Sequence, residues 1–222
     1  GSITSQVSVN AAAGFSIVTY TGTGSNATVG HGLSIAPELV IVKNRDDSSK
    51  NWNSYVKVLG NSYIDLNRSN GVYTGSTYFQ NTAPSSTVFS IGAAGSSNED
   101  DDKFIAYAFH SVAGYSKIGL YKGNAGAFKF VYCGFAPAVI ITKSIGGTGW
   151  RIIDNKRTTF NPSKASLYPD SDGEEYNGSG HETDFLSNGF RMMNSNSRLN
   201  TNNQTYIFIA FAENPFKHTN AR

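Results

Sequence analysis

The feature that most constrains this chain is an internal repeat. HGLSIAPELVIVKN at His31–Asn44 and YCGFAPAVIITKS at Tyr132–Ser144 are nearly the same sequence, and an offset of 100 residues separates Pro37 from Pro137. Other landmarks recur in the same order at a spacing of about 100 residues: Trp52 with Trp150, Leu66 with Leu167, Phe89 with Phe190, and Phe109 with Phe211. Landmarks that keep both order and spacing indicate that one structural unit is present twice.

The segments between these landmarks are typical of strands. FSIVTY at Phe15–Tyr20 alternates apolar and polar residues, whereas ELVIVK at Glu38–Lys43 is a dense β-branched run. No segment longer than ten residues has a helical period. Many short strands separated by Gly and Asn predict an all-β fold, with antiparallel β-sandwiches made of two internally duplicated halves. The other expected strands are Trp52–Leu59, Val88–Ile91, Phe104–Phe109, Lys117–Tyr121, Phe128–Tyr132, Ala138–Lys143, Trp150–Ile153, Phe190–Met193 and Tyr206–Phe211.

The repeat also predicts the domain organisation. Residues 1–13 are small and polar and are expected to form a connector, with Gly1-Ser2 typical of a cloning remnant. Residues 14–116 form the first repeat and residues 117–222 the second; one shared core and two separate cores both remain open. Two pairs of matched residues are expected in the core, because a residue kept in both copies serves what the copies share: Ile41 with Ile141, and Trp52 with Trp150.

Composition excludes several classes of function. Charged residues make up 15% of the chain and its net charge is +2, against roughly 25% charged residues in an ordinary protein. No basic stripe is present, so we expect no nucleic-acid binding. Cys133 is alone and lies in an apolar run, which predicts a small buried side chain and no disulfide framework. No apolar run approaches 18 residues, so no membrane insertion is expected.

Catalytic and metal motifs are weak. The chain has no Gly-x-Ser-x-Gly motif and no His pair with metal-ligand spacing. Asp184 and Glu213 are carboxylates of the kind that a glycosidase needs, but nothing in the sequence singles them out. DSDGEE at Asp170–Glu175 resembles the start of a calcium loop without completing it. We therefore expect no enzyme, no catalytic residues, no metal and no cofactor.

Two long loops stand out as candidates for recognition. Asn67–Ser85 and Tyr168–Leu186 have 19 residues each and fill the same interval in the two halves. Their sequences differ while the flanking strands match, which is typical of a kept scaffold with loops free to bind. Sugar recognition needs aromatic faces with amide, hydroxyl and carboxylate partners. The alternative is that both loops are disordered tips or trimer contacts. The candidate ligand-binding residues are Tyr73, Tyr78, Asn81, Asp172, Tyr176 and His181.

Several motifs together resemble a known family. TYTGTG, the HGL–AP–VIVKN stretch, Trp52, the YAFHSVAGYS link and the terminal AENPFK–AR are similar to phage virion domains of tail fibres and tail-associated proteins. The resemblance covers essentially Gly14 to Arg222 and supplies no catalytic residues. It implies a location in the virion, at the host surface, and a homotrimer with other tail-fibre subunits as partners.

We therefore expect a non-enzymatic receptor-binding domain that attaches to a host-surface glycan or receptor protein. A purely structural virion domain is the alternative. A polysaccharide-degrading tailspike domain is the less favoured third class.

Overall fold

The computed structural model describes residues 1–126 and 128–214, so His218 and the end of the AENPFK–AR motif lie outside the described residues. The chain divides into two compact units. The first contains Gly1–Asn67 and Val72–His110, and the second contains Arg68–Gly71 and the chain from Ser111 onward. The division therefore falls six residues earlier than the boundary expected from the sequence, and four residues of the first long loop belong to the second unit. The two units are described separately below.

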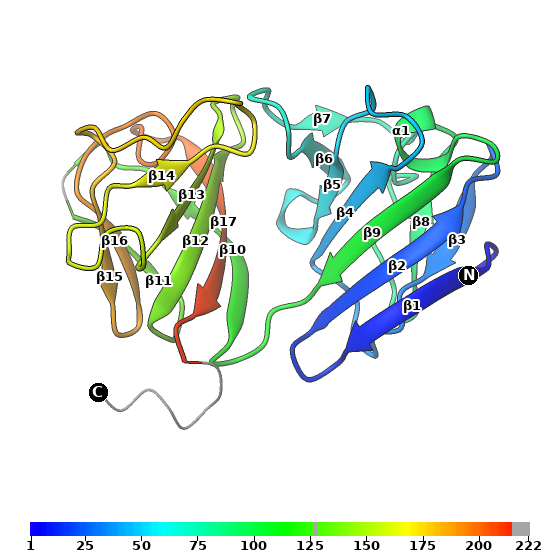
Figure 1. The fold of residues 1–222 in the computed structure, drawn as a ribbon, viewed down its shortest axis with the longest axis horizontal. Coiled ribbons are helices and arrows are strands. Elements are labelled where there is room, and N and C mark those ends of the chain that lie inside the picture. The colour runs from blue at the N-terminus through cyan, green and yellow to red at the C-terminus, as the bar shows by residue number, and fades with distance from the viewer. Residues whose placement is uncertain (127, 215–222) are drawn as a thin grey trace. The chain divides into compact units, whose positions relative to one another are not determined.

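The first unit is an antiparallel sandwich (Figure 1). Its larger sheet has seven strands in the order β1-β2-β9-β4-β5-β6-β7, and its smaller sheet pairs β3 with β8. A 3-10 turn, η1 (Lys57–Leu59), and a short helix, α1 (Gly95–Asn98), lie in the connections. The strands are β1 (Ser5–Asn10), β2 (Phe15–Thr21), β3 (Ala27–Gly30), β4 (Leu39–Asn44), β5 (Asn53–Val56), β6 (Ser62–Asp65), β7 (Tyr73–Thr74), β8 (Val88–Ile91) and β9 (Lys103–Phe109).

The core of the first unit lies between these two sheets. Alternation along β4 places Val40 and Val42 inside at 0% exposure, and β8 contributes Phe89 and Ile91 from the facing sheet. Side chains on successive residues of a strand point to opposite faces, so half of each strand enters the core. The sandwich is thus held by the apolar faces of both sheets, as the alternating sequence predicts.

The second unit has the same architecture. Its larger sheet has the order β10-β17-β12-β13-β14 and its smaller sheet the order β11-β16-β15. A separate core forms between them, from residues such as Phe135, Ile140, Phe190 and Phe208. The strands are β10 (Ser116–Lys122), β11 (Lys129–Tyr132), β12 (Pro137–Ser144), β13 (Trp150–Asp154), β14 (Ser166–Leu167), β15 (Thr183–Leu186), β16 (Gly189–Met192) and β17 (Thr205–Ala212).

Strand order shows that the two units are copies of one design. The run β2-β9-β4-β5-β6 corresponds to β10-β17-β12-β13-β14, and β3-β8 corresponds to β11-β16. Side chains follow the same plan. The ring of Tyr20 stacks on Phe104 with centroids 5.1 Å apart, and that of Tyr121 stacks on Tyr206 at 5.0 Å. The all-β fold of antiparallel sandwiches expected from the sequence is confirmed.

Two buried asparagines explain why the Gly-rich turns recur. Asn98 Oδ1 accepts the N–H of Thr23 at 2.9 Å, and Asn200 Oδ1 accepts that of Asn124 at 2.9 Å. The turn itself passes so close to the opposite loop that a side chain is excluded. A Cβ on Gly22 would lie 1.9 Å from the carbonyl oxygen of Glu99, and one on Gly123 would lie 2.2 Å from that of Thr201. Glycine therefore recurs at these two positions because any side chain there would clash with the opposite loop.

The strand that carries the strongest sequence repeat has a matched lysine at its end. Lys43 Nζ donates to the carbonyl oxygens of Asp47 and Lys50, at 3.2 and 2.6 Å. Lys143 Nζ donates to those of Thr148 and Arg68, at 2.6 and 3.0 Å, within the second unit. In both copies the ammonium group therefore satisfies carbonyl groups of an irregular loop, which would otherwise lack donors.

Four expectations from the sequence are wrong, the last of them the core position of Trp52. Residues 1–13 are not a connector, because Ser5–Asn10 forms β1 and pairs with β2 over its whole length, and Ile3 is buried. Ile41 and Ile141 are only half-buried, because the alternation places their neighbours in the core instead.

The third error concerns Trp52–Leu59, where the strand ends at Val56 and η1 follows. The matched tryptophans also differ. Trp150 is 1% exposed and lies in the core, whereas Trp52 is half-buried and stacks on Tyr107 with ring centroids 6.4 Å apart.

Candidate functional site

The first long loop holds its tyrosines in a ring cluster. Tyr73 lies in β7, opposite Tyr63 of β6, and their ring centroids are 5.3 Å apart. The ring of Tyr78 also lies against that of Tyr63, with a centroid distance of 4.4 Å. Burial, reinforced by the neighbouring Tyr78, raises the pKa of Tyr63. Asn81 is exposed with a φ of 47° and stands apart from the cluster. Two of the three predicted residues therefore contact the same ring, that of Tyr63, and Tyr78 packs with Tyr63 against the core of the first unit.

The second long loop forms a similar cluster in its own unit. The ring centroids of Tyr176 and His181 are 4.5 Å apart, and Tyr168 hydroxyl and His181 Nδ1 are 3.3 Å apart. Tyr176 is 37% exposed and its hydroxyl donates to the carbonyl oxygen of Ser179. Asp172 is exposed and is not part of this cluster. Two of the three predicted residues of this loop are therefore neighbours, and Tyr176 is the exposed one.

A buried arginine supports this cluster. Arg151 is 1% exposed and donates to Ser166 Oγ at 3.0 Å and to the carbonyl oxygen of His181. Burial lowers the pKa of Arg151 to about 10. Burial, together with the charges of Arg151 and Arg198, lowers the pKa of His181 to about 4. The imidazole is therefore neutral near pH 7 and acts as a packed ring with a hydrogen-bonding nitrogen.

The carboxylates considered above as catalytic or metal-binding candidates form ion pairs and hydrogen bonds within the second unit. Asp170 accepts the backbone N–H of Trp150 at 2.7 Å and pairs with Arg198 at 3.2 Å. Asp184 is buried and pairs with Arg191, and Glu213 pairs with Lys156 at 3.4 Å. Within residues 1–126 and 128–214 no cluster of three or more His, Cys, Asp or Glu side chains is arranged to hold a metal ion. These contacts account for the carboxylates without assigning them a chemical reaction.

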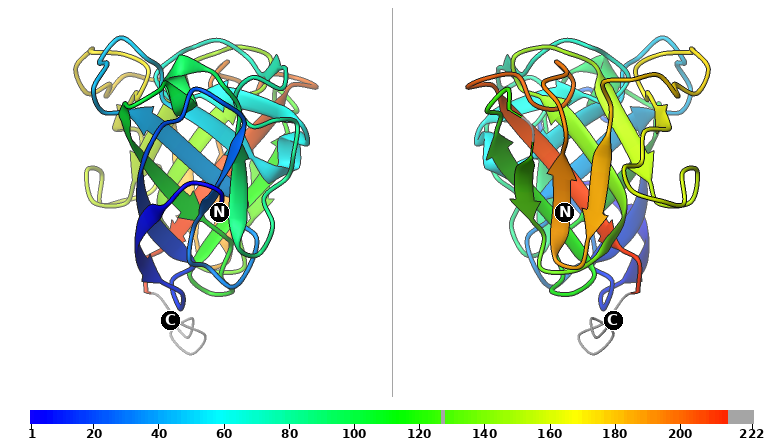
Figure 2. Two further views of the ribbon diagram at one scale, coloured as in Figure 1. Left: turned by 90° about the vertical axis from the view of Figure 1, so that its right-hand side faces the viewer. Right: turned by 90° about the vertical axis from the view of Figure 1, so that its left-hand side faces the viewer.

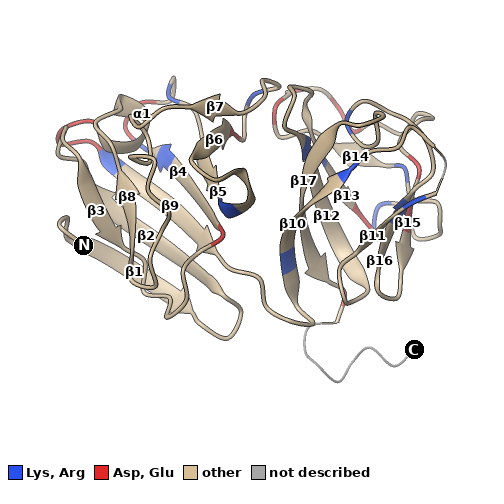
Figure 3. Cartoon of the chain, turned by 180° about the vertical axis from the view of Figure 1, so that it is seen from behind, with Lys and Arg blue, Asp and Glu red and all other residues tan. Residues whose placement is uncertain are grey.

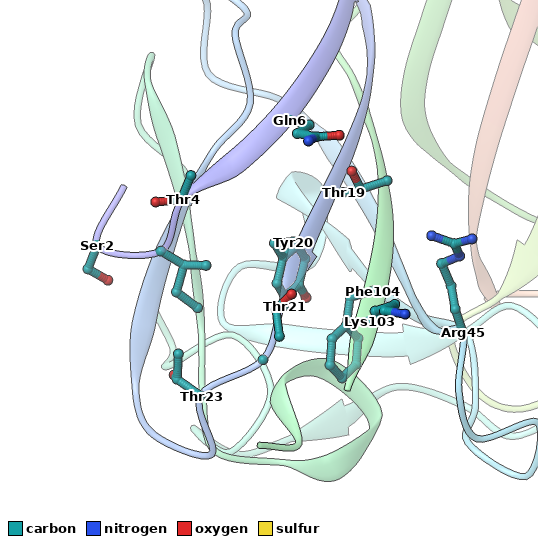
Figure 4. A pocket seen from close by; sticks show the side chains of 12 residues that line it. Ser2, Thr4, Gln6, Thr19, Tyr20, Thr21, Thr23, Arg45, Lys103 and Phe104 are labelled. Carbon is teal, nitrogen blue, oxygen red and sulfur yellow. The ribbon is translucent and has the colours of Figure 1, made fainter. Parts of the chain in front are cut away.

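A pocket that includes none of the predicted residues lies in the first unit. Its volume is about 670 Å³, within the usual range for ligand sites. Half of its lining residues carry a hydroxyl group, but most of its lining surface is apolar, and Tyr20 and Phe104 are among its aromatic residues (Figure 4). Figure 4 shows Arg45 on the opposite side of the pocket from Ser2 and Thr23. The lining residues are Ser2, Ile3, Thr4, Gln6, Thr19, Tyr20, Thr21, Gly22, Thr23, Arg45, Lys103 and Phe104.

Two cations give this pocket its charge. Arg45 follows β4, Lys103 begins β9, and both are exposed. Neither forms an ion pair within the described part of the chain. Elsewhere acidic and basic residues are scattered through both units (Figure 3). Figure 2 gives two further views of the ribbon. A pocket with hydroxyl groups, an amide and two cations suits a polar ligand that carries an anionic group.

The scaffold does not require these cations. The N–H of Arg45 donates to the carbonyl oxygen of Lys103 at 2.8 Å, and in the second unit the N–H of Ile145 donates to that of Thr205 at 3.1 Å. The backbone contact is thus kept in both copies, while the two cations are replaced by Ile145 and Thr205. The difference between the two repeats at these positions is therefore the sequence feature that marks Arg45 and Lys103. Loop length does not reveal it, because both residues lie next to strands outside the long loops.

A second pocket lies in the second unit. Its volume is about 380 Å³, and an exposed aromatic residue, Phe160, is part of its wall. No local sequence pattern marks this pocket either, because its residues come from three separate segments: 155–161, Phe185 and Glu213.

The chain was compared with protein families, curated proteins and solved structures. No curated protein and no solved structure matches the chain. Among the helices that the structure describes, none has the length and apolar character needed to cross a membrane. A family described as "Domain of unknown function (DUF7483)" matches residues 1–215, so nearly the whole sequence is covered. The chain therefore belongs to the DUF7483 family.

Proposed function

We propose that this chain is a non-catalytic recognition module of a phage tail fibre or tail-associated protein. It attaches the virion to a host-surface glycan that carries an anionic group, and the pocket of the first unit holds that group. The motif resemblance supplies the virion context, and the pocket supplies the chemistry. The tail-fibre location, the trimer and the glycan partner are all parts of this proposal.

The observation that carries the proposal is the difference between equivalent positions. Arg45 and Lys103 of the first unit correspond to Ile145 and Thr205 of the second, although the backbone contact between them is the same. A residue that the fold does not need is free to serve a ligand. Guanidinium and ammonium groups form charge-assisted hydrogen bonds with carboxylate, sulfate or phosphate oxygens, and arginine does so in a bidentate way.

The wall of the pocket favours a glycan over a compact inorganic anion. Gln6, Thr19 and Thr21 come from paired strands, so the register of β1 and β2 fixes their backbone positions. Amide and hydroxyl side chains both donate and accept, as sugar hydroxyl groups require. Groups held on strands lose little freedom on binding, which favours affinity.

A purely structural role in the virion is the second candidate. It is favoured by exposed aromatic residues at one edge of the second unit: Phe128 at 58%, Phe130 at 41% and Tyr132 at 58% exposure. Aromatic side chains are enriched in contacts between subunits. In a trimeric fibre such an edge would face a neighbouring subunit.

Binding of a labelled chain to a glycan array and to host cells tests the proposal. Arg45→Gln with Lys103→Gln should weaken binding to anionic glycans at least tenfold and should reduce its salt dependence. The matched control is Lys57→Gln with Lys122→Gln, which removes the same charge at exposed positions outside the pocket. A chain that binds neither glycans nor cells overturns the glycan role in favour of the structural one, and a double variant that binds like the control overturns the assignment of the anionic group to this pocket.

A further inference from the structure

The second pocket has the parts of a separate sugar site. It lies wholly within the second unit and is lined by Asn155, Lys156, Thr158, Thr159, Phe160, Asn161, Phe185 and Glu213. We propose that this pocket binds one pyranose ring of an uncharged glycan, with the ring of Phe160 as its stacking platform. The inference deepens the proposed recognition function by naming a second ligand class at a different place.

Phe160 is unusual because of its exposure. Its side chain is 82% exposed, more than that of any other large apolar residue that the structure describes as exposed. Leaving so much apolar surface in water is unfavourable by roughly 25 cal/mol per Å². The flat face of an aromatic ring matches the apolar C–H face of a pyranose, and stacking removes both from water. An exposed ring in the wall of a polar pocket therefore suits a sugar better than a wholly polar ligand.

The loop that carries this ring is fixed to a strand. Asn161 Nδ2 donates to the carbonyl oxygen of Phe185 at 2.9 Å, and Asn161 Oδ1 accepts the N–H of Phe185 at 2.9 Å. This pair of bonds joins the loop to β15 in the manner of a strand pairing. The residue next to Phe160 is therefore held in place, so the ring is presented without a large ordering cost on binding.

Asn155 supplies an unused acceptor at the same pocket. Among the residues that the structure describes, its Oδ1 has no hydrogen-bond partner although the atom is buried from solvent. A buried acceptor without a donor costs about 1–3 kcal/mol. Because the atom is buried, the Asn155 amide has to turn toward the pocket that it lines before a sugar hydroxyl can donate to this oxygen. The unsatisfied oxygen thus points to a ligand with hydrogen-bond donors.

The charges of the pocket cancel. Lys156 Nζ and Glu213 Oε1 are 3.4 Å apart, and their side chains are 75% and 37% exposed. The ammonium group can donate to a sugar hydroxyl and the carboxylate can accept from one, while the pair contributes no net charge. This separates the site from the basic pocket of the first unit and indicates an uncharged ring. A volume of about 380 Å³ is at the low end for ligand sites, which fits one ring rather than a long chain.

Saturation-transfer NMR with methyl hexopyranosides tests the inference directly. The probes are methyl α-glucopyranoside, methyl β-galactopyranoside and methyl N-acetyl-β-glucosaminide, each added to the full chain. We expect at least one to receive saturation, most strongly at the ring protons of its apolar face. Phe160→Ala should reduce the transfer at least tenfold. Phe128→Ala is the matched control, because Phe128 is also exposed but lies outside the pocket; it should leave the transfer unchanged.

A second variant separates binding from folding. Asn155→Leu removes the unsatisfied acceptor with a side chain of similar size, so the melting temperature should stay the same or rise while sugar binding falls at least fivefold. Equal transfer to Phe160→Ala and wild type, or no transfer from wild type to any of the three probes at tens of millimolar, overturns the inference. Arg45→Gln with Lys103→Gln should leave this transfer intact, so failure here and failure of the anionic-glycan proposal are distinguishable.

Discussion

The two units share the same order of strands but differ at the edges of their sheets. In the first unit the segment before β2 crosses from one sheet to the other: the N–H of Ile3 donates to the carbonyl oxygen of Thr28 at 3.1 Å, and β1 then pairs along β2. In the second unit β10 ends its sheet within the described chain. Phe130 and Tyr132 stand at the positions of Thr28 and Gly30 and are exposed. The edges are thus where the copies diverged, while the strand order stayed the same.

The copies also differ in the polar groups that they bury. Asn53 of the first unit and Arg151 of the second are opposite equivalent residues, Val42 and Thr142. Asn53 Nδ2 donates to Asp65 Oδ1 at 2.6 Å, whereas Arg151 donates to Ser166 and to the backbone of His181. Buried polar groups need partners, and each copy provides different ones: Asp65 of β6 in the first unit, and Ser166 of β14 with the backbone of His181 in the second. The copies therefore differ in their interior contacts as well as in their surface loops.

The largest expected effect comes from removing the segment that only the first unit has. Deletion of residues 1–10 removes β1 and the buried side chain of Ile3. The unfolding free energy of the first unit should fall by at least as much as in a large-to-small core substitution, which costs about 2–5 kcal/mol. Hydrogen exchange of amides in β2 and β9, compared with β10 and β17, measures the two units separately. Equal loss of protection in both units would contradict the separate cores.

Acid should weaken the second unit through His181. Its pKa is lowered to about 4, so below its ordinary value near 6.5 the unfolded chain binds a proton that the folded chain does not. Stability is therefore complete above about pH 6.5 and falls as pH decreases toward 4, by about 3 kcal/mol in total. Denaturant unfolding of the second unit between pH 7 and 4 checks this. His181→Gln should flatten the dependence, and an unchanged slope in that variant would assign the acid sensitivity to other groups.

The first unit has an acid-sensitive histidine at a different place. His31 Nδ1 accepts the N–H of Leu33 at 3.1 Å and its Nε2 lies 3.1 Å from the carbonyl oxygen of Ser85, an arrangement that suits the neutral ring. Burial lowers the pKa of His31, so the first unit also loses stability as pH falls below the ordinary value. The second unit has Cys133 at this position. His31→Cys should therefore remove this part of the acid sensitivity, as measured by exchange of the β3 and β8 amides at pH 7 and 5.

Matched tyrosines test the shared design. Tyr20 hydroxyl donates to the carbonyl oxygen of Ser97 at 2.6 Å, and Tyr121 hydroxyl donates to that of Leu199 at 2.7 Å. Tyr20→Phe and Tyr121→Phe each leave one buried carbonyl without its donor, so each should cost its own unit about 1–3 kcal/mol. Exchange-detected unfolding free energies of the two units give the comparison. Effects that differ by more than about 1 kcal/mol would show that the copies use this bond differently.

The strands that the two copies share could be predicted from the sequence. Ten of the eleven expected strands match observed strands to within one residue at each end, because strand period and the repeated landmarks reinforce one another. It placed Ile41 and Ile141 in the core because a dense β-branched run hides its own alternation: both faces of β4 and β12 are apolar. It missed β1 because SQVSVN carries small and polar residues, and its pairing with β2 depends on tertiary context.

The candidate sites were harder to predict for the same reason. The length of the two loops favours their aromatic residues as exposed ligand contacts, whereas Tyr73 and Tyr78 pack against Tyr63. The pockets gather residues that are far apart in the chain, such as Gln6 with Lys103 and Phe160 with Glu213. Only the fold brings these residues together, so no local sequence pattern predicts the pockets.

The smallest expected effect concerns the two loop tyrosines, and it separates the loops from the pockets. Tyr73→Ala removes a ring that stacks on Tyr63, and Tyr176→Ala removes a partly exposed ring beside His181. An aromatic pair contributes about 0.5–1.5 kcal/mol, so each change should lower the stability of its own unit by about 1 kcal/mol. Attachment to cells should be unchanged in the double variant, because neither tyrosine lines either of the two pockets described above. If attachment is lost while both units stay folded, the tyrosine clusters contact the receptor and the pockets do not.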